Sequence, residues 1–241
     1  MTRVAALVLL AMVAGCGGSS SGTAGDRPTV LAASSLTEVF QSIDPDAKYS
    51  FGGSDELASQ IQEGAPADVY AAASPKYPNQ LHDDGLVDEP QIFATNRLVI
   101  VVPSGNPAGI ETVADLATPG TKVVIGAEGV PIGDYTRTVL DSMGMNAVLD
   151  SVVSNEDDVK GVLAKVAAGD ADAGFVYATD AKAAGAEVEA IELPASAQAK
   201  VEYPITMVTD AAHEEAAQQF VDLVMSDEGQ QQLREAGFGP P

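Results

Sequence analysis

From Thr29 onward, short apolar runs rich in β-branched residues alternate with longer segments of helical periodicity. This alternation is typical of strands joined by crossover helices, and it favours a parallel or mixed sheet covered by helices. The expected strands are 29–33, 49–52, 69–72, 98–103, 122–126, 173–177, 188–193 and 201–208. The expected helices are 36–42, 55–63, 77–84, 113–116, 133–142, 156–168 and 211–234, the last broken near Asp227. The predicted class is therefore α/β.

Two of the expected strands, 98–103 and 201–208, bracket a central block of about a hundred residues that has strands and helices of its own. We expect the chain to enter a second lobe at the first of these hinge strands and to leave it at the second. Lobe one then comprises residues 28–97 and 204–241, and lobe two comprises residues 98–203. Clefts between such lobes are preferred ligand sites. No internal repeat is evident in the sequence.

The first sixteen residues, MTRVAALVLLAMVAGC, differ in composition from the rest of the chain. The apolar run over residues 4–13 is too short to span a bilayer and has the length of a signal-peptide core. It ends in Val13-Ala14-Gly15-Cys16, which resembles the bacterial lipobox, where the cysteine is lipidated. Residues 17–27 are rich in glycine and serine and predict a flexible linker. We expect residues 1–16 to be a lipoprotein signal peptide and Cys16 to anchor the protein at the extracytoplasmic face of the cell membrane.

The charge and the rare residues exclude several classes of function. Twelve basic residues against 35 acidic ones give a net charge of −23, which repels nucleic acid. A single cysteine and two histidines exclude a disulfide framework and a zinc finger. His82 and His213 lie in polar helix ends, and the G-x-S-x-G motif of serine hydrolases is absent. We therefore expect a monomeric binding protein without a cofactor, and not an enzyme.

Four of the expected helices begin with residues that are typical of helix N-termini, two in each lobe. They are Ser35-Leu36-Thr37-Glu38, which matches a capping box, then Ser54-Asp55-Glu56, Pro131-Ile132-Gly133 and Ser154-Asn155-Glu156. Unpaired N–H groups and the positive end of the helix dipole favour a negative ligand there. None of the four starts carries a lysine or arginine, so neutral hydrogen bonds and dipoles would hold the anion across the cleft.

Short motifs along residues 29–241 carry a family resemblance. In lobe one they are Ala32-Ala33-Ser34-Ser35-Leu36-Thr37-Glu38, Phe51-Gly52-Gly53-Ser54, Gly64-Ala65-Pro66-Ala67-Asp68-Val69 and Asn96-Arg97-Leu98-Val99. In lobe two they are Val130-Pro131-Ile132-Gly133, Glu156-Asp157-Asp158-Val159, Val176-Tyr177 with Asp180-Ala181, and Val201-Glu202-Tyr203-Pro204-Ile205. Together they resemble the periplasmic molybdate-binding proteins of ABC transporters, the ModA family. The resemblance implies a two-lobed type II periplasmic binding fold, with mixed sheets flanked by helices and two hinge strands.

The same resemblance implies a set of ligand-binding residues. In the family, two serine hydroxyls, a tyrosine hydroxyl and backbone N–H groups hold a tetrahedral oxyanion, and no protein atom ligates the molybdenum. By motif, the serines are Ser35 and Ser54, the tyrosine is Tyr177, and the backbone donors include Ile132 and Val159. Ser34 is the alternative to its neighbour Ser35. The implied ligand is molybdate or tungstate, and the implied partner is an ABC permease that recognises the closed form.

Hydrogen-bond chemistry distinguishes some of the candidate oxyanions. Molybdate and tungstate carry no proton at neutral pH, whereas phosphate keeps one, and burying that proton without an acceptor costs about 1–3 kcal/mol. Asp55 and Asp134 follow two of the helix starts and could accept such a proton, although carboxylates in a first turn also complement the helix dipole. Sulfate or phosphate as the ligand, and a sensor role in place of transport, are the alternatives that the sequence leaves open.

Overall fold

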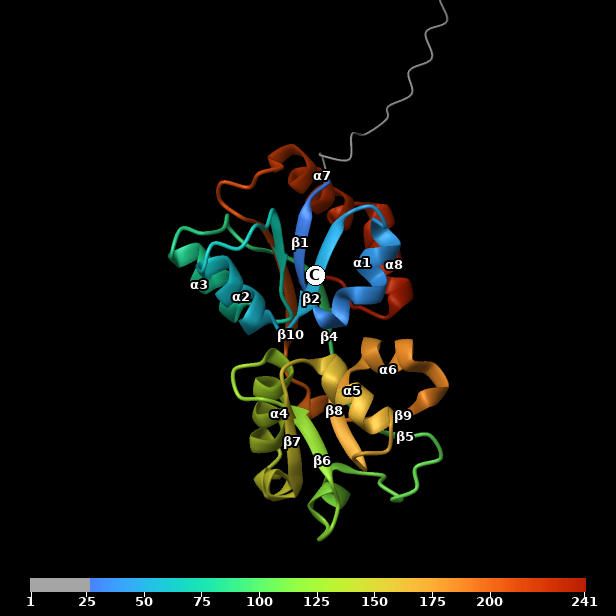
Figure 1. The fold of residues 1–241 in the computed structure, drawn as a ribbon. Coiled ribbons are helices and arrows are strands. Elements are labelled where there is room, and N and C mark those ends of the chain that lie inside the picture. Colours follow the sequence, from blue (N-terminus) through green and yellow to red (C-terminus); the bar gives the residue numbers. More distant parts are fainter. Residues whose placement is uncertain (1–26) are drawn as a thin grey trace, which may run out of the picture.

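The computed structural model of the protein describes residues 27–241, which form two α/β lobes stacked end to end (Figure 1). The lobe-one sheet has the strand order β2-β1-β3-β10-β4, and the lobe-two sheet has the order β7-β6-β8-β5-β9. The predicted α/β class, with two mixed sheets flanked by helices, is confirmed. The predicted signal peptide, Cys16 and the linker up to residue 26 lie outside the described residues.

The elements of each lobe have the following bounds. Lobe one contains β1 (Thr29–Ala33), α1 (Thr37–Ile43), β2 (Lys48–Gly52), α2 (Ser54–Gln62), β3 (Val69–Ala71), α3 (Lys76–Asp83), β4 (Gln91–Asn96), β10 (Val201–Met207), α7 (Glu214–Met225) and α8 (Asp227–Ala236). Lobe two contains β5 (Leu98–Pro103), β6 (Val123–Gly126), α4 (Pro131–Ser142), β7 (Val152–Glu156), α5 (Val159–Ala167), β8 (Ala173–Tyr177), α6 (Ala178–Ala184) and β9 (Val188–Glu192).

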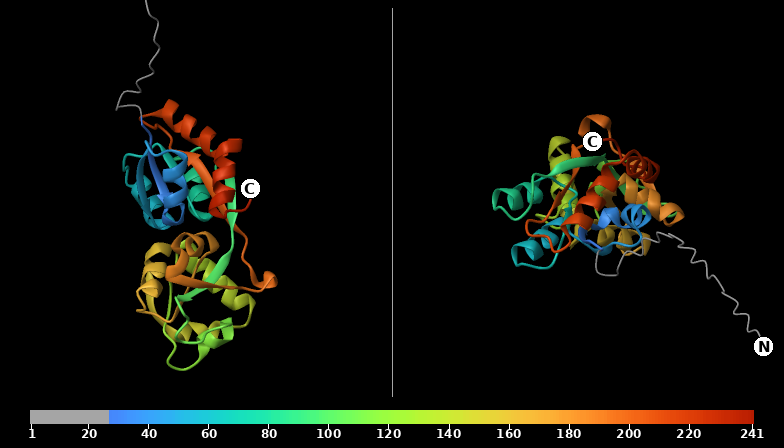
Figure 2. Two further views of the ribbon diagram at one scale, coloured as in Figure 1. Left: turned by 90° about the vertical axis from the view of Figure 1, so that its right-hand side faces the viewer. Right: turned by 90° about the horizontal axis from the view of Figure 1, so that it is seen from above.

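The two sheets have the same arrangement of strand directions. In lobe one, β1 is parallel to β2 and β3, and β10 runs antiparallel to both β3 and β4. In lobe two, β6 is parallel to β7 and β8, and β5 runs antiparallel to both β8 and β9. The antiparallel strand of each sheet is the first strand that follows a crossing between the lobes. Figure 2 shows both crossings along one side of the molecule.

The return crossing ends earlier than the predicted lobe boundary at residue 204. Val201 of β10 already pairs with Asn96 of β4, and Tyr203 pairs with Ala94. Residues 201–203 therefore belong to the lobe-one sheet, because their backbone hydrogen bonds are made there. The crossing itself lies between the end of β9 at Glu192 and the start of β10.

Other expectations also need correction. Neither β4 nor α6 was among the expected elements, and β7 occupies residues that were expected to start a helix. β7 is an edge strand that pairs in parallel with β6 and alternates in burial, so tertiary pairing overrides the local helical signal. The expected helix over 113–116 is a 3-10 helix, Val113–Ala117. The predicted break of the last helix is present, since Ser226 caps α8 by accepting the N–H of Gly229.

The core of each lobe lies between its sheet and the flanking helices. β5 (Leu98–Pro103) and β6 (Val123–Gly126) are continuous apolar runs that are almost fully buried, as expected for strands covered on both faces. In lobe one, Phe40 of α1 packs against Phe93 of β4 and edge-on against Phe220 of α7. No helix of residues 27–241 is both long enough and apolar enough to cross a membrane.

Candidate functional site

A small cavity lies between the two lobes. Its lobe-one side is formed by Ala33, Ser34, Ser35, Gly52, Gly53, Ser54 and Ala73, and its lobe-two side by Val130, Pro131, Ile132, Asp158, Val159 and Tyr177. All five residues that the sequence analysis assigned to the ligand line this one cavity. The space left free by protein atoms holds only about one water-sized sphere, so the cavity suits a small ion rather than a drug-sized molecule.

The cavity lies where strands end and helices begin. Ser54 is the first residue of α2, Ile132 the second of α4 and Val159 the first of α5, and Tyr177 is the N-cap of α6. The first N–H groups of a helix have no acceptor within the helix, so donors and positive dipole ends from both lobes surround the cavity. In Figure 1 the starts of these helices face one another across the junction of the lobes.

Neither predicted serine caps a helix. Ser35 lies inside a 3-10 helix, Ser34–Leu36, that leads into α1, and its Oγ is 2.9 Å from the hydroxyl oxygen of Tyr203. The expected capping box is therefore wrong, and Glu38 instead pairs with Lys160. Ser54 follows the N-cap Gly53, and its Oγ accepts the N–H of Ala73 at 3.1 Å. Both hydroxyls are held by hydrogen bonds from their own lobe.

Tyr177 is buried, and its hydroxyl has no hydrogen-bond partner within residues 27–241. Burial raises the pKa of this hydroxyl well above its usual value, so the group stays protonated and can donate. Its ring packs edge-on against Tyr203. Buried hydroxyls are rarely left without a partner, so an unpaired one in a cavity indicates a ligand that accepts hydrogen bonds.

The fourth helix start differs from the prediction. Ser154 lies in β7, where its Oγ contacts Glu156 and Lys165. Asp158 is the true N-cap of α5, and its Oδ1 accepts the N–H of Gly161 at 2.8 Å. The sequence analysis missed Asp158 as a lining residue, although an aspartate directly before an apolar helical run is itself a signal for an N-cap.

Because α5 begins at Val159, a lysine does lie at one of the four helix starts. Lys160 is the second residue of α5, but it does not line the cavity. Its Nζ lies 2.7 Å from Glu38 of lobe one and 3.5 Å from Asp180 of lobe two. The cavity wall itself therefore contains no basic side chain from the described part of the chain.

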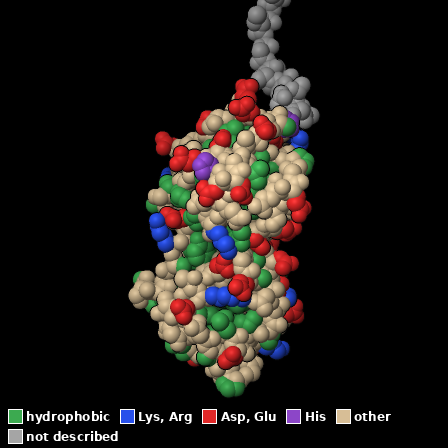
Figure 3. Space-filling model, turned by 90° about the vertical axis from the view of Figure 1, so that its left-hand side faces the viewer, with side chains coloured by type: hydrophobic (Ala, Val, Ile, Leu, Met, Phe, Trp, Pro, Cys, Tyr) green, Lys and Arg blue, Asp and Glu red, His purple; other side chains and the backbone are tan. Residues whose placement is uncertain are grey.

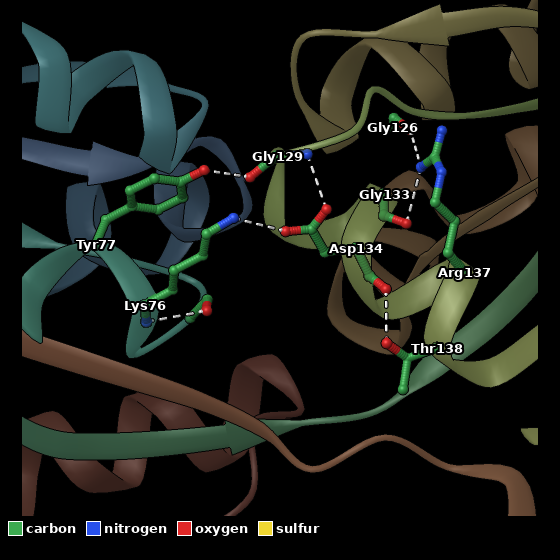
Figure 4. A network of polar contacts seen from close by, with 9 residues as sticks. Lys76, Tyr77, Gly126, Gly129, Gly133, Asp134, Arg137 and Thr138 are labelled. Atoms are coloured by element: carbon green, nitrogen blue, oxygen red, sulfur yellow. Dashed lines mark hydrogen bonds and ion pairs between the residues drawn. The ribbon is translucent and has the colours of Figure 1, made fainter. Parts of the chain in front are cut away.

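The two aspartates that could have accepted a ligand proton do not line the cavity. Asp134 binds Lys76 across the lobe junction at 3.0 Å and accepts the N–H of Gly129 at 2.8 Å (Figure 4). One carboxylate oxygen of Asp55 is buried and unpartnered within residues 27–241, but this residue is absent from the cavity wall. Among the same residues, no group of three or more His, Cys, Asp and Glu side chains could hold a metal ion.

The lobes touch each other around the cavity. The hydroxyl of Tyr77 donates to the carbonyl of Gly129 at 2.6 Å, beside the Lys76–Asp134 pair in Figure 4. Gly53 approaches lobe two so closely that a Cβ there would lie 2.5 Å from the carbonyl oxygen of Asp157. On the face in Figure 3, lysine and arginine side chains lie near the waist, whereas acidic side chains are spread over both lobes. Contacts between the lobes therefore flank the cavity.

Comparison with known proteins places this arrangement in a family. The family described as bacterial extracellular solute-binding protein matches residues 29–239. The molybdate-binding protein ModA of Mycobacterium tuberculosis is 35% identical over 257 aligned positions, which cover all of this chain and 97% of that protein. The putative ABC transporter substrate-binding lipoprotein YvgL of Bacillus subtilis is 31% identical, with 98% of this chain and 96% of the relative covered.

The fold has a close structural counterpart. The periplasmic molybdate-binding protein of Azotobacter vinelandii superimposes with a TM-score of 0.78 at 22% identity, covering 89% of this chain and all of that one. At this identity the likeness concerns the fold alone, whereas the full-length match to ModA concerns the family. The chain therefore belongs to the ModA family of bacterial extracellular solute-binding proteins.

Proposed function

We propose that this protein captures molybdate, and tungstate in the same site, between its two lobes outside the cytoplasm and delivers it to an ABC permease. As a member of its family, the chain is a binding protein and not an enzyme, and the oxyanion is its transported ligand and not a cofactor. The observation that carries the proposal is the unpaired hydroxyl of Tyr177 in a cavity lined by helix N-termini.

The hydrogen bonds within lobe one prepare both serines to donate. Because Ser54 Oγ accepts the N–H of Ala73, its own proton is free for a ligand oxygen. Ser35 Oγ can accept from Tyr203 in the same way, which frees its proton as well. Together with Tyr177 and the N–H groups of Ile132 and Val159, these hydroxyls give a set of donors for the four oxygens of a tetrahedral oxyanion.

The donor set favours an anion without a proton. Asp158 is the only carboxyl residue in the cavity wall that the structure describes, and its Oδ1 is engaged by Gly161. The other polar groups that the proposal assigns to the ligand are donors, so a protonated phosphate whose proton faces them would leave it unpaired, at a cost of about 1–3 kcal/mol. Sulfate is also a dianion without a proton, so size must separate it from molybdate.

Lipid anchoring and the transport role complete the proposal. The sequence around Cys16 and the match to a B. subtilis lipoprotein support a protein that is tethered to the extracytoplasmic face of the membrane, and we propose that it acts there as a monomer. A tether keeps the closed, loaded protein close to a permease in the same membrane. Closure follows from the donor arrangement, because the oxyanion is fully coordinated only when both lobes contribute.

Titration calorimetry with molybdate, tungstate, sulfate and phosphate tests the proposed ligand. We expect one-to-one binding of molybdate and tungstate and no detectable heat from the other two anions. Tight binding of sulfate or phosphate, with molybdate silent, would reassign the ligand while leaving the cavity in place. Uptake of molybdate by cells lacking this gene tests the transport role, because a sensor would leave uptake intact.

A further inference from the structure

Asp180 is a buried carboxyl group outside the cavity wall that the site as described does not use. It lies in the first turn of α6, its side chain is 0% exposed, and neither carboxylate oxygen has a hydrogen-bond partner within residues 27–241. The nearest cation, Lys160, lies 3.5 Å from Oδ1, which is an ion-pair distance without a hydrogen bond. Buried carboxylates normally receive several hydrogen bonds, so the charged form of Asp180 is poorly stabilised here.

The charges around Asp180 come from both lobes. Lys160 is shared, because its Nζ lies closer to Glu38 of lobe one than to Asp180. Glu38 and Asp158 add negative charge, so three carboxyl groups face one ammonium group. Burial, with smaller contributions from the negative charges of Glu38 and Asp158, raises the pKa of Asp180 to about 7 against the opposing effect of Lys160.

The other groups near this turn do not neutralise Asp180. The hydroxyls of Tyr177 and Tyr203 lie within electrostatic range, and both are neutral because burial raises their pKa values. Lys182, the cation of α6, donates to the carbonyl of Glu235 in lobe one. Lys160 is therefore the cation that compensates Asp180 in this part of the described chain.

Lobe one provides part of the burial around this turn. A crevice between the lobes is lined by Ser35, Glu38 and Val39 from lobe one and by Thr179, Lys182 and Ala183 from α6. Asn96 donates to Thr179 at 2.9 Å, so the residue before Asp180 is also bound to the opposite lobe. Separating the lobes would remove Glu38 from Lys160 and admit water to the start of α6.

We propose that Asp180 takes up a proton when the two lobes close around the oxyanion, so that ligand binding is coupled to protonation of this carboxyl group. The inference rests on the proposed function, because it needs an anion bound between the lobes. In the open form, a hydrated Asp180 paired with Lys160 is ionised at neutral pH. In the closed form, desolvation favours the neutral acid, and a dianion at the start of the same helix, beside Tyr177, favours it further.

The sign of the pH dependence follows from linkage. The closed form has the raised pKa, of about 7, and we take the ordinary carboxyl pKa of 3.8 as the upper bound for the open form, because pairing with Lys160 lowers it. Between these values the closed form holds a proton that the open form releases, so binding tightens as pH falls. Affinity is lost as pH rises towards 7 and becomes constant above about pH 8.

Calorimetric titration of the protein with sodium molybdate at pH 6, 7 and 8, in two buffers of different ionisation enthalpy, tests the coupling. We expect uptake of nearly one proton at pH 6 and almost none at pH 8, with affinity about ten-fold higher at pH 6. Asp180→Asn should abolish both the proton uptake and the pH dependence. Asp222→Asn, an exposed change on α7, should retain both.

A second variant tests the role of the opposite lobe without altering a buried residue. Glu38 is more than half exposed, and Glu38→Gln removes a charge that disfavours ionised Asp180 while freeing Lys160 to pair with it. The midpoint of proton uptake should therefore move to lower pH. This variant, with the paired-buffer measurement on the unaltered protein, keeps the test decisive if Asp180→Asn does not fold.

The outcomes separate the two proposals. Failure of molybdate to bind at any pH would overturn the proposed function, and the coupling with it. Binding with the same affinity from pH 6 to 8 and no proton uptake would overturn the coupling alone. A midpoint that Glu38→Gln leaves unchanged would contradict the contribution of lobe one.

Discussion

The two lobes have the same strand arrangement but contribute to the cavity in different ways. Lobe one presents hydroxyl groups that its own atoms already hold, Ser35 through Tyr203 and Ser54 through Ala73. Lobe two presents the N-termini of α4 and α5 and the hydroxyl of Tyr177, which has no partner in the described residues. The lobe-one hydroxyls are thus held in place by their own lobe, whereas the Tyr177 hydroxyl of lobe two is left unpaired among the described residues.

The cores of the two lobes also differ in composition. Five of the six phenylalanines of the chain lie in lobe one, and the lobe-two exception is Phe175. Tyr203 packs edge-on against Phe93 and Phe238, so the residue that holds Ser35 is itself fixed by aromatic neighbours. Lobe two is filled mainly by valine, isoleucine and leucine. The two lobes therefore have similar topology but differently packed cores. The aromatic core of lobe one supports Ser35 at the cavity.

The largest expected effect on molybdate affinity is at Gly53, which contacts lobe two. Gly53→Ala would place a methyl group 2.5 Å from the backbone carbonyl of Asp157, which cannot move aside as a flexible side chain would. The backbone of Gly53 has φ −63°, which alanine also adopts. Within lobe one the methyl group would lie 2.8 Å from Oδ1 of Asp55, a side chain that has to shift, so thermal denaturation without ligand should accompany the titration. We expect molybdate affinity to fall on the order of 100-fold, about 3 kcal/mol, in a calorimetric titration.

Gly52→Ala is the matched control for this substitution. Gly52 also lines the cavity, but its methyl group would meet only Glu56 and Leu57 of lobe one, at 3.7 Å or more, and no atom of lobe two, so the loss of affinity should be smaller. Equal losses in the two variants would mean that lobe contact at Gly53 does not limit binding.

The second prediction separates ligand binding from stability in lobe two. Tyr177→Phe removes a hydroxyl that bonds to no other described residue, so the free energy of unfolding without ligand should stay the same or rise slightly. Affinity for molybdate should fall by about 1.5–3 kcal/mol, the usual value of a hydrogen bond to a charged group. Thermal denaturation with and without molybdate measures both quantities. A marked loss of stability without ligand would show that the hydroxyl is already satisfied within the protein.

The third prediction concerns Ser54 of lobe one, where ligand affinity and stability should change together. Ser54→Ala removes an acceptor from the buried N–H of Ala73, so the free energy of unfolding should fall by about 1–3 kcal/mol and affinity by a similar amount. Ser59→Ala on the exposed face of the same helix serves as a control and should change neither by more than about 0.5 kcal/mol. Ser54→Ala with full stability and reduced affinity would erase the distinction between the lobes.

The smallest effect is expected at the rim of the cleft. Lys76 and Asp134 form an ion pair across the lobes, but both side chains are at least one-third exposed. Such pairs contribute about 0.2–1 kcal/mol, so Lys76→Gln should weaken molybdate binding less than about five-fold. The difference from the unaltered protein should vanish at high salt. A larger, salt-independent loss would place Lys76 among the groups that the ligand itself requires.

Much of the fold follows from local patterns. The apolar runs at 98–103 and 173–177 are strands because buried strands covered by helices need continuous β-branched and apolar residues. The break at Ser226 is visible as an N-cap signal. By contrast, β7 could not be predicted, because its residues 152–156 become a strand only through pairing with β6. The capping box at Ser35 failed for a similar reason, since Tyr203, 168 residues away, engages the hydroxyl.

The sequence by itself determined the α/β class, the two-lobed organisation and the motifs whose residues now line one cavity. These features depend on local composition and spacing, which remain legible without knowing what lies nearby in space. Only the tertiary structure decided that Tyr177 is left without a partner, that Lys160 joins Glu38 to Asp180, and that Gly53 touches the opposite lobe. Each of these depends on burial and distance between segments far apart in the chain, and desolvation acts only once those segments meet.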